Sequence, residues 1–145
     1  MTRELKGANW GRQAMSRSVC VIVPSVANAV ELGITLDGLL SQTYYGPLEI
    51  VVVGPGSDSG REQAESRGVR FIDDAASRTR GDACNVALEA TESDLVMFTD
   101  DDVIVPKEWV ANLARWFERP GVAGVGGPNF APPEHSTLQQ QIIDV

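Results

Sequence analysis

The sequence predicts an α/β domain built on a mainly parallel sheet with flanking helices, and three observations support this prediction. Short apolar runs alternate with segments of helical periodicity along the chain, as expected where strands and helices take turns. The apolar run at residues 19–23 is continuous, which is typical of a parallel strand covered on both faces. A length of 145 residues with 43% hydrophobic content suits a single domain with a real core.

Each predicted strand is a short, largely apolar run that ends near Pro, Gly or Asp. Five such runs are expected to form strands: residues 19–23, 48–53, 69–72, 95–98 and 122–125. Pro24 closes the first run, and the Gly54-Pro55-Gly56 turn ends the second, because Pro and Gly interrupt regular structure. Because all five strands alternate with helical segments, we expect them to run parallel in one sheet.

Helical spacing between these runs predicts four helices. They cover about residues 29–42, 57–67, 80–91 and a segment that starts at Pro106. Gly68 stands where a C-cap is expected, and alanines in the third helix allow close contact with the sheet. Pro106 suits the first position of the fourth helix, where its missing N–H costs nothing. The expected buried stripe of that helix is Trp109, Leu113, Trp116 and Phe117.

Charge divides the chain into a flexible basic arm at 1–17 and a folded domain at 18–145. The arm holds four basic residues and one acid, without the apolar stretch of a secretory signal. The net charge is −8, and the remainder carries 19 acidic against 8 basic residues, or −11. A domain this acidic would repel a polyphosphate backbone, which argues against nucleic-acid binding. No apolar run reaches the roughly 18 residues of a membrane span, so we expect a cytoplasmic protein.

The cysteines and the histidine exclude several kinds of site. Cys20 and Cys84 lie far apart in sequence without a C-x-x-C spacing, so we expect buried free thiols rather than a metal site or a disulfide. His135 is the only histidine. Any mechanism that requires a pair of histidines within this chain is therefore excluded.

Three adjacent aspartates, Asp100, Asp101 and Asp102, follow the fourth predicted strand. Like charges this close raise one another's pKa unless something positive intervenes. Mg²⁺ or Mn²⁺ would satisfy them, because such ions are commonly held by one or two carboxylates plus substrate phosphate oxygens. The alternative is a simple turn in which one Asp caps the helix at Pro106.

The acidic run is expected to face two other segments. In a parallel α/β sheet, ligands bind beyond the carboxyl ends of the strands, where the strand order reverses. Residues 24–25, 54–57 and 100–102 all follow predicted strands. We therefore expect these three segments to converge on one binding site.

Residues 19–128 resemble the donor-binding half of a family 2 glycosyltransferase, which has the Rossmann-like GT-A fold. The matching segments are VIVPS at 21–25, LLSQTY at 39–44, LEIVVV at 48–53, RGDACNVAL at 80–88, and FTDDD at 98–102 with Pro106 and Trp109. The S-Q-T-Y segment before a strand, joined to the later acidic run, makes chance similarity a poor explanation.

The resemblance implies a role for individual residues. Asp100 and Asp102 match the D-x-D acids that hold a divalent metal, Mn²⁺ or Mg²⁺, on the donor diphosphate. The substrate-binding residues that it implies are Pro24, Ser25, Arg80 and Asp101. Arg80 would lie near the nucleotide or its phosphates, and an Arg side chain is well suited to clamp phosphate.

Two segments depart from the family pattern. Gly54-Pro55-Gly56-Ser57 stands where the family usually has Asp-Asp-Gly-Ser, and Pro24-Ser25-Val26-Ala27-Asn28 replaces the common P-T-Y-N-R opening. Both segments belong to the half of the site that recognises the base. The diphosphate and metal half is therefore expected to be better preserved than the base half.

The resemblance implies inverting transfer of a sugar from a nucleoside diphosphate to an acceptor that the sequence does not identify. A carboxylate must then take the acceptor's proton. Glu134 and Asp144 match no family motif, so we expect the base beyond Val145 and a domain truncated at its C-terminus. In a longer parent protein the domain could lie at the cytoplasmic face of a membrane. Copies could also pair through apolar surface that an incomplete domain exposes.

Three alternatives stay open. A sugar-1-phosphate nucleotidyltransferase shares the architecture, but no Gly-rich basic loop follows the first predicted strand. A signalling receiver domain would need acids where Pro24 and Ser25 stand. A non-catalytic relic of the same fold, serving assembly, would use the acidic run only as a turn.

Overall fold

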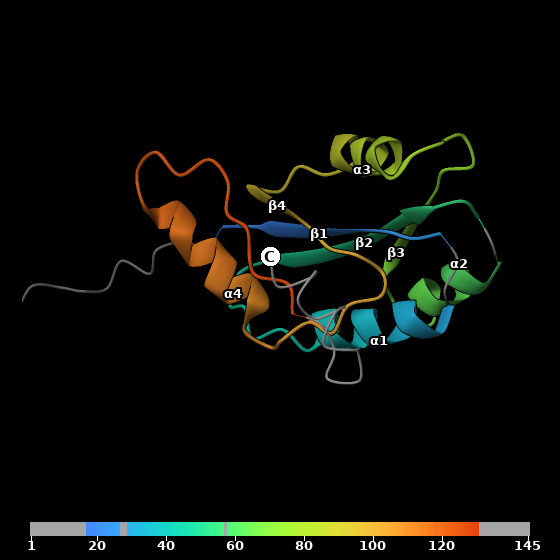
Figure 1. Ribbon diagram of the computed structural model, residues 1–145, viewed down its shortest axis with the longest axis horizontal. Helices are drawn as coiled ribbons and strands as arrows, with labels where there is room; N and C mark the ends of the chain where they lie inside the picture. Colours follow the sequence, from blue (N-terminus) through green and yellow to red (C-terminus); the bar gives the residue numbers. More distant parts are fainter. Residues whose placement is uncertain (1–16, 27–28, 57, 131–145) are drawn as a thin grey trace, which may run out of the picture.

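The computed structural model describes residues 17–26, 29–56 and 58–130, and a four-stranded parallel sheet lies at their centre (Figure 1). The strands are β1 (Val19–Pro24), β2 (Leu48–Gly54), β3 (Arg70–Asp73) and β4 (Leu95–Phe98). Their order in the sheet is β3-β2-β1-β4, and every neighbouring pair is parallel. This confirms the α/β class and four of the predicted strands.

Helices cover both faces of the sheet. Helices α1 (Ala29–Leu40) and α2 (Asp58–Glu65) lie on one face and α3 (Arg80–Glu89) on the other (Figure 1). Helix α4 (Trp109–Ala114) continues into a 3-10 turn, η1 (Arg115–Glu118). The helices α1 to α3 fall within the predicted segments, and Gly68 takes the left-handed conformation with φ +70°, as expected after a helix C-terminus.

The continuous apolar run of β1 supplies two cores, one on each face. Val19, Val21 and Val23 pack with α1, α2 and α4, whereas Cys20 and Ile22 face α3. Successive side chains of a strand point to opposite faces, so a strand between two helical layers must be apolar at every position. All six residues of β1 are buried, as expected for a strand that has a neighbouring strand on each side.

Helix α3 contacts the sheet through small residues. Ala83 and Ala87 are buried against Cys20 and Ile22, which confirms the expected close contact. Burial raises the pKa of the Cys20 thiol, because the thiolate would lose its hydration. Both cysteines are free, but Cys84 is only half-buried, so the expectation of two buried thiols is wrong for Cys84.

The predicted fifth strand at residues 122–125 is wrong, because this segment is coil. Gly121, with φ +82°, turns the chain just before it, and Ala123 and Gly124 are exposed. Among the described residues, β4 pairs only with β1. An apolar run becomes a strand only when a neighbouring strand completes its hydrogen bonds, and the described residues provide none here.

The fourth helix begins later than predicted. Its first residue is Trp109, not Pro106, and the Trp109 N–H donates to the Pro106 carbonyl in a preceding turn at 3.0 Å. The buried residue of α4 is Val110, and Trp116 is 37% exposed. The predicted stripe is therefore only partly correct: Trp109, Leu113 and Phe117 pack against the core, and Trp116 lies outside it.

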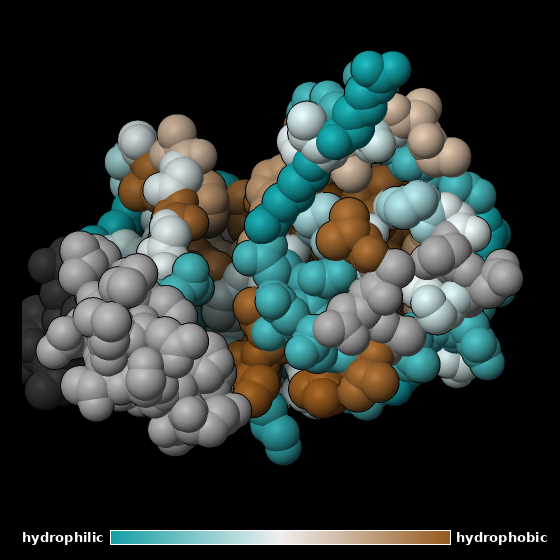
Figure 2. All heavy atoms as spheres, turned by 45° about the vertical axis from the view of Figure 1, so that its right-hand side comes forward, coloured by the Kyte–Doolittle hydropathy of each residue, from teal (hydrophilic) through white to brown (hydrophobic). Residues whose placement is uncertain are grey.

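The surface mixes apolar and polar side chains. Figure 2 shows hydrophobic side chains in separate groups among hydrophilic ones on the face it presents. Exposed apolar side chains include Val30, Ile34 and Ile104. No helix in the described part of the chain is long and apolar enough to cross a membrane. The predicted arm lies almost wholly outside the described residues and stays a prediction, as does pairing between copies.

Candidate functional site

A cavity of about 360 Å³ opens at the carboxyl ends of β1, β2 and β4. Its volume falls within the usual range of small-molecule sites. It is lined by Pro24, Ser25, Val26, Gly54, Pro55, Ser77, Arg78, Thr79, Arg80, Ala83, Asp100, Asp101 and Asp102. The strand order reverses beside β1, since β2 and β4 follow it in sequence but flank it on opposite sides, which is where such sheets bind ligands.

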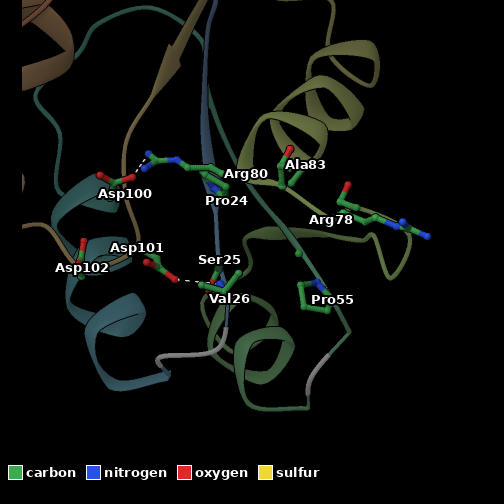
Figure 3. Close-up of a pocket in the computed structure, with 13 residues that line it drawn as sticks. Pro24, Ser25, Val26, Pro55, Arg78, Arg80, Ala83, Asp100, Asp101 and Asp102 are labelled. Atoms are coloured by element: carbon green, nitrogen blue, oxygen red, sulfur yellow. Dashed lines mark hydrogen bonds and ion pairs between the residues drawn. The ribbon is translucent and has the colours of Figure 1, made fainter.

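The three segments expected to meet at this edge do meet there. Pro24 and Ser25, Gly54 and Pro55, and the three aspartates all line the cavity (Figure 3). Arg80 joins them from the start of α3. All six residues predicted for the metal or the substrate are thus brought to one cavity, although their roles stay predictions. Asp144 and Glu134 lie outside the described residues.

The acidic turn after β4 is fastened on two sides. The Thr99 N–H donates to the Ile22 carbonyl at 3.2 Å, which joins the turn to β1. The Asp101 carboxylate accepts from the Val26 N–H at 3.3 Å (Figure 3). These bonds hold the turn against the β1–α1 connection. Asp100 and Asp102 flank Asp101, whose carboxylate is bonded to this connection.

Arg80 forms an ion pair with Asp100 (Figure 3). It is the first residue of α3, whose start is fixed by a capping box between Thr79 and Asp82. The Thr79 hydroxyl accepts from the Asp82 N–H at 3.1 Å, and the Asp82 carboxylate accepts from the Thr79 N–H at 3.0 Å. Hydrogen bonds from Thr79 and from the backbone of Arg78 lower the pKa of Asp82, since they favour its charged form.

Gly54 lets two strand ends approach each other at the back of the cavity. A Cβ at this position would lie 2.1 Å from the Ser25 carbonyl oxygen, so only glycine fits. Ser25 is just 5% exposed, and its hydroxyl has no hydrogen-bond partner among the described residues. A buried polar group without a partner is uncommon. The Ser25 hydroxyl is therefore an unsatisfied polar group in a residue that lines the cavity.

The acidic residues fit a divalent metal only if a substrate shares its coordination. Carboxylate oxygens are suitable ligands for Mg²⁺ or Mn²⁺. In the described part of the chain, however, no group of three or more His, Cys, Asp or Glu side chains forms a ready-made metal site. Asp100 faces Arg80 and Asp101 binds the Val26 amide. The donor set thus suits an ion that also takes oxygens from a bound phosphate.

The sequence did not identify the segment after β3 as part of the site. Ser77, Arg78 and Thr79 line the cavity, and the buried Asp74 shapes this segment by accepting from the Ser77 N–H at 3.1 Å. The spacing of Thr79 and Asp82 is that of a capping box. That signal could have marked where α3 starts, but not that the preceding loop faces a cavity.

Comparison with known proteins identifies relatives of this chain. The sequence profile described as glycosyl transferase family 2 matches residues 20–143. An uncharacterised protein, y4gI, of Sinorhizobium fredii is 28% identical over 122 residues, which is 79% of this chain and 13% of that protein. An N-acetylglucosaminyltransferase of Azorhizobium caulinodans is 28% identical over 135 residues, which is 88% of this chain and 34% of the enzyme. The chain thus spans about a third or less of these relatives.

Solved structures have the same fold. A mannosyltransferase of Pyrobaculum calidifontis, in complex with GDP-Man and Mn²⁺, aligns with a TM-score of 0.68 and 26% identity over 75% of this chain and 34% of that one. Glucosyl-3-phosphoglycerate synthase of Mycobacterium tuberculosis aligns with a TM-score of 0.55 and 24% identity over 65% of this chain and 36% of that one, a likeness of fold alone. Since the family profile covers most of its length, the chain belongs to glycosyl transferase family 2.

Proposed function

We propose that this chain binds a nucleoside-diphosphate sugar in the cavity, through a divalent metal, for inverting transfer of the sugar to an acceptor. The observation that carries the proposal is the meeting of three aspartates, one arginine and the Pro24-Ser25 strand end in one cavity of about 360 Å³. These residues come from three separate segments of the chain. Their convergence at the reversal of strand order is what a ligand site on this type of sheet requires.

In this proposal the diphosphate lies between the acidic turn and the start of α3. Asp100 and Asp102 would hold Mn²⁺ or Mg²⁺, which neutralises the charge of a leaving nucleoside diphosphate when bound. Arg80 would clamp a phosphate, as a planar guanidinium does well. The mannosyltransferase relative was solved with GDP-Man and Mn²⁺, which supports a donor and a metal of this class.

The nucleoside would lie beside the end of β1. Ser25 offers a buried hydroxyl without a partner among the described residues, and Asp101 stays bonded to the Val26 amide. Pro24, Val26 and Pro55 add apolar surface to the wall of the cavity. The β2 end presents Gly54 and Pro55 in place of acids, so we propose that the base is held mainly by shape and by Ser25.

Transfer also requires a general base within hydrogen-bond reach of the acceptor hydroxyl. The carboxylates that line the cavity are the three aspartates, and each already has a role in binding the donor. We therefore propose that the base comes from outside residues 17–130.

The test is the melting temperature of the chain with Mn²⁺ and either UDP or GDP. A nucleotide at 100 times its dissociation constant stabilises a fold by about 2.7 kcal/mol, which for a domain of this size raises the melting temperature by roughly 5 °C or more. We expect this rise only when Mn²⁺ is present, and we expect Asp102→Ala to abolish it. Glu92→Ala, which removes an exposed carboxylate elsewhere, is the matched control.

The result also separates this proposal from its alternatives. If neither nucleotide raises the melting temperature of the unmodified chain at any Mn²⁺ concentration, the proposal is wrong and a role in assembly is favoured. If a nucleoside triphosphate with a sugar 1-phosphate stabilises the chain but the diphosphates do not, a nucleotidyltransferase is favoured.

A further inference from the structure

Arg80 is paired with Asp100, one of the two carboxylates that the proposed metal would need. Its guanidinium forms an ion pair with Asp100, and Figure 3 shows the side chain reaching from the start of α3 toward the acidic turn. Asp101, next along the chain, is bonded to the Val26 amide instead. Of the three acids, therefore, Asp100 is the one whose charge is already balanced by the protein itself.

The pair is open enough to exchange. The Arg80 side chain is 57% exposed and that of Asp100 is 43% exposed. Ion pairs with this much access to water are weak, because solvent screens both charges. A diphosphate offers the guanidinium two oxygens and a stronger, charge-assisted contact. Arg80 can therefore leave Asp100 when a phosphate arrives, without the cost of breaking a buried pair.

We propose that Arg80 is an exchangeable counter-ion that makes the site select the metal–diphosphate complex over the bare metal ion. Without a diphosphate, Arg80 holds Asp100 and repels a cation. With a diphosphate, Arg80 turns to the phosphate and leaves Asp100 to the metal. The inference rests on the proposed function, and it adds that each ligand raises the affinity for the other by the same factor, because linkage between two bound ligands is reciprocal.

A second group in the same cavity supports a ligand there. The Ser25 hydroxyl is nine-tenths buried and without a partner among the described residues, on the strand end adjoining the acidic turn. The cavity thus contains an unused hydrogen-bonding group as well as an internally satisfied acid. Both features are expected of a site that binds a phosphorylated ligand in preference to a metal ion alone.

Arg78 provides a matched contrast. It lines the same cavity and stands two residues before Arg80. It makes no ion pair within the described residues, and Figure 3 shows its side chain extending away from the acids. Arg78→Gln removes the same charge from the same cavity as Arg80→Gln. Only Arg80→Gln removes the ion-pair partner of the Asp100 carboxylate.

The experiment measures Mn²⁺ binding to the whole 145-residue chain by the loss of the free-ion signal in electron paramagnetic resonance. Titrations are run with Mn²⁺ alone and again with saturating UDP or GDP, whichever binds. We expect Arg80→Gln to tighten binding of Mn²⁺ alone by about tenfold, through lost competition and lost repulsion. We expect Arg78→Gln to change it by about twofold or less. Far-ultraviolet circular dichroism checks that each variant folds.

Arg80→Gln should have the opposite effect on binding of the diphosphate. With saturating Mn²⁺, Arg80→Gln is expected to weaken nucleotide binding by about tenfold, because a charge-assisted phosphate contact is lost. Arg80→Lys keeps the positive charge but not the planar guanidinium. Its affinity for the nucleotide should therefore lie between that of the unmodified chain and that of Arg80→Gln. A variant that had simply lost its structure would not bind Mn²⁺ more tightly while it binds the nucleotide more weakly.

The outcomes separate the inference from the proposed function. If the unmodified chain binds neither nucleotide in the presence of Mn²⁺, the proposed function is wrong. If it binds a nucleotide but Arg80→Gln fails to tighten binding of Mn²⁺ alone, or Arg78→Gln tightens it equally, the counter-ion role is wrong while the donor site stands. The counter-ion role is also wrong if neither the unmodified chain nor Arg80→Gln binds Mn²⁺ alone.

Discussion

The hydroxyl of Thr35 is bonded twice to the backbone of Val103. It donates to the Val103 carbonyl at 2.9 Å and accepts from the Val103 N–H at 3.1 Å. Thr35 is fully buried in the middle of α1, and Val103 directly follows the third aspartate of the acidic turn. A single hydroxyl therefore fixes the turn that carries the proposed metal ligands to the helix behind it.

Thr35→Val replaces this hydroxyl by a methyl group of similar size. Two backbone groups of Val103 then lose their partner, so we expect a loss of about 1–3 kcal/mol in the free energy of unfolding. The freed turn should also weaken Mn²⁺-dependent nucleotide binding. Urea denaturation and nucleotide titration measure the two effects. Thr35→Ser keeps the hydroxyl and should cost about 1 kcal/mol at most, and equal losses in both variants would contradict this role.

Gln42 joins the end of α1 to the start of α4. Its side-chain amide donates to the carbonyls of Gly38 and Pro106, at 3.1 and 2.7 Å, and its oxygen accepts from the Val110 N–H at 2.9 Å. Gln42→Glu cannot donate to either carbonyl, so we expect a loss of about 1–3 kcal/mol. Ser41→Ala, which removes one local bond to Gly38, should cost less in the same urea denaturation experiment.

Gly54→Ala tests the close approach at the back of the cavity. The added Cβ would meet the Ser25 carbonyl oxygen at 2.1 Å, so the end of β1 must move. Overpacking of this kind costs about 1–3 kcal/mol, and the displaced Ser25 should abolish nucleotide binding. Gly124→Ala, where nothing lies within 4 Å of the new atom, is the control. Normal binding by Gly54→Ala would show that the cavity does not depend on this contact.

Acid should destabilise the fold partly through Asp94. Its carboxylate accepts from the N–H and the hydroxyl of Ser18, at 2.8 and 2.9 Å, and these hydrogen bonds lower its pKa. A depressed folded-state pKa stabilises the fold above the unfolded pKa of about 3.9, and this stability is lost as pH falls through the folded value. Urea midpoints at pH 7 and pH 3 measure the loss.

Asp94→Asn should be less stable than the unmodified chain at pH 7, and its urea midpoint should fall less on going to pH 3. The control, Glu92→Gln, removes an exposed neighbouring carboxylate and should keep the full acid sensitivity. An equal fall in the Asp94→Asn and unmodified proteins would show that the Ser18 contact does not contribute.

Local sequence patterns predict most of this fold. The continuous apolar run of β1 locates a strand that is covered on both faces, because such a strand has no side that faces water. Gly68 marks a helix end through its left-handed conformation, and the small residues Ala83 and Ala87 mark a helix that lies close to the sheet. Each of these signals arises within one element, so no knowledge of distant partners is needed.

Features that depend on distant partners were missed or misplaced. Residues 122–125 have the composition of a strand but no neighbour among the described residues, and Pro106 lies in a turn rather than in α4. The same limit applies to the site. The sequence indicates that Arg80 and Asp100 belong to it, but their ion pair and the cavity wall at Ser77–Thr79 follow from how α3 lies over the sheet.

The most direct test of the donor site is the position of manganese in crystals grown with Mn²⁺ and UDP or GDP, located by its anomalous scattering. We predict a single strong peak between the carboxylates of Asp100 and Asp102 and the two phosphates of the nucleotide, with Arg80 turned from Asp100 toward a phosphate. A nucleotide bound in the cavity without manganese at these aspartates, or manganese bound elsewhere on the chain, would contradict it.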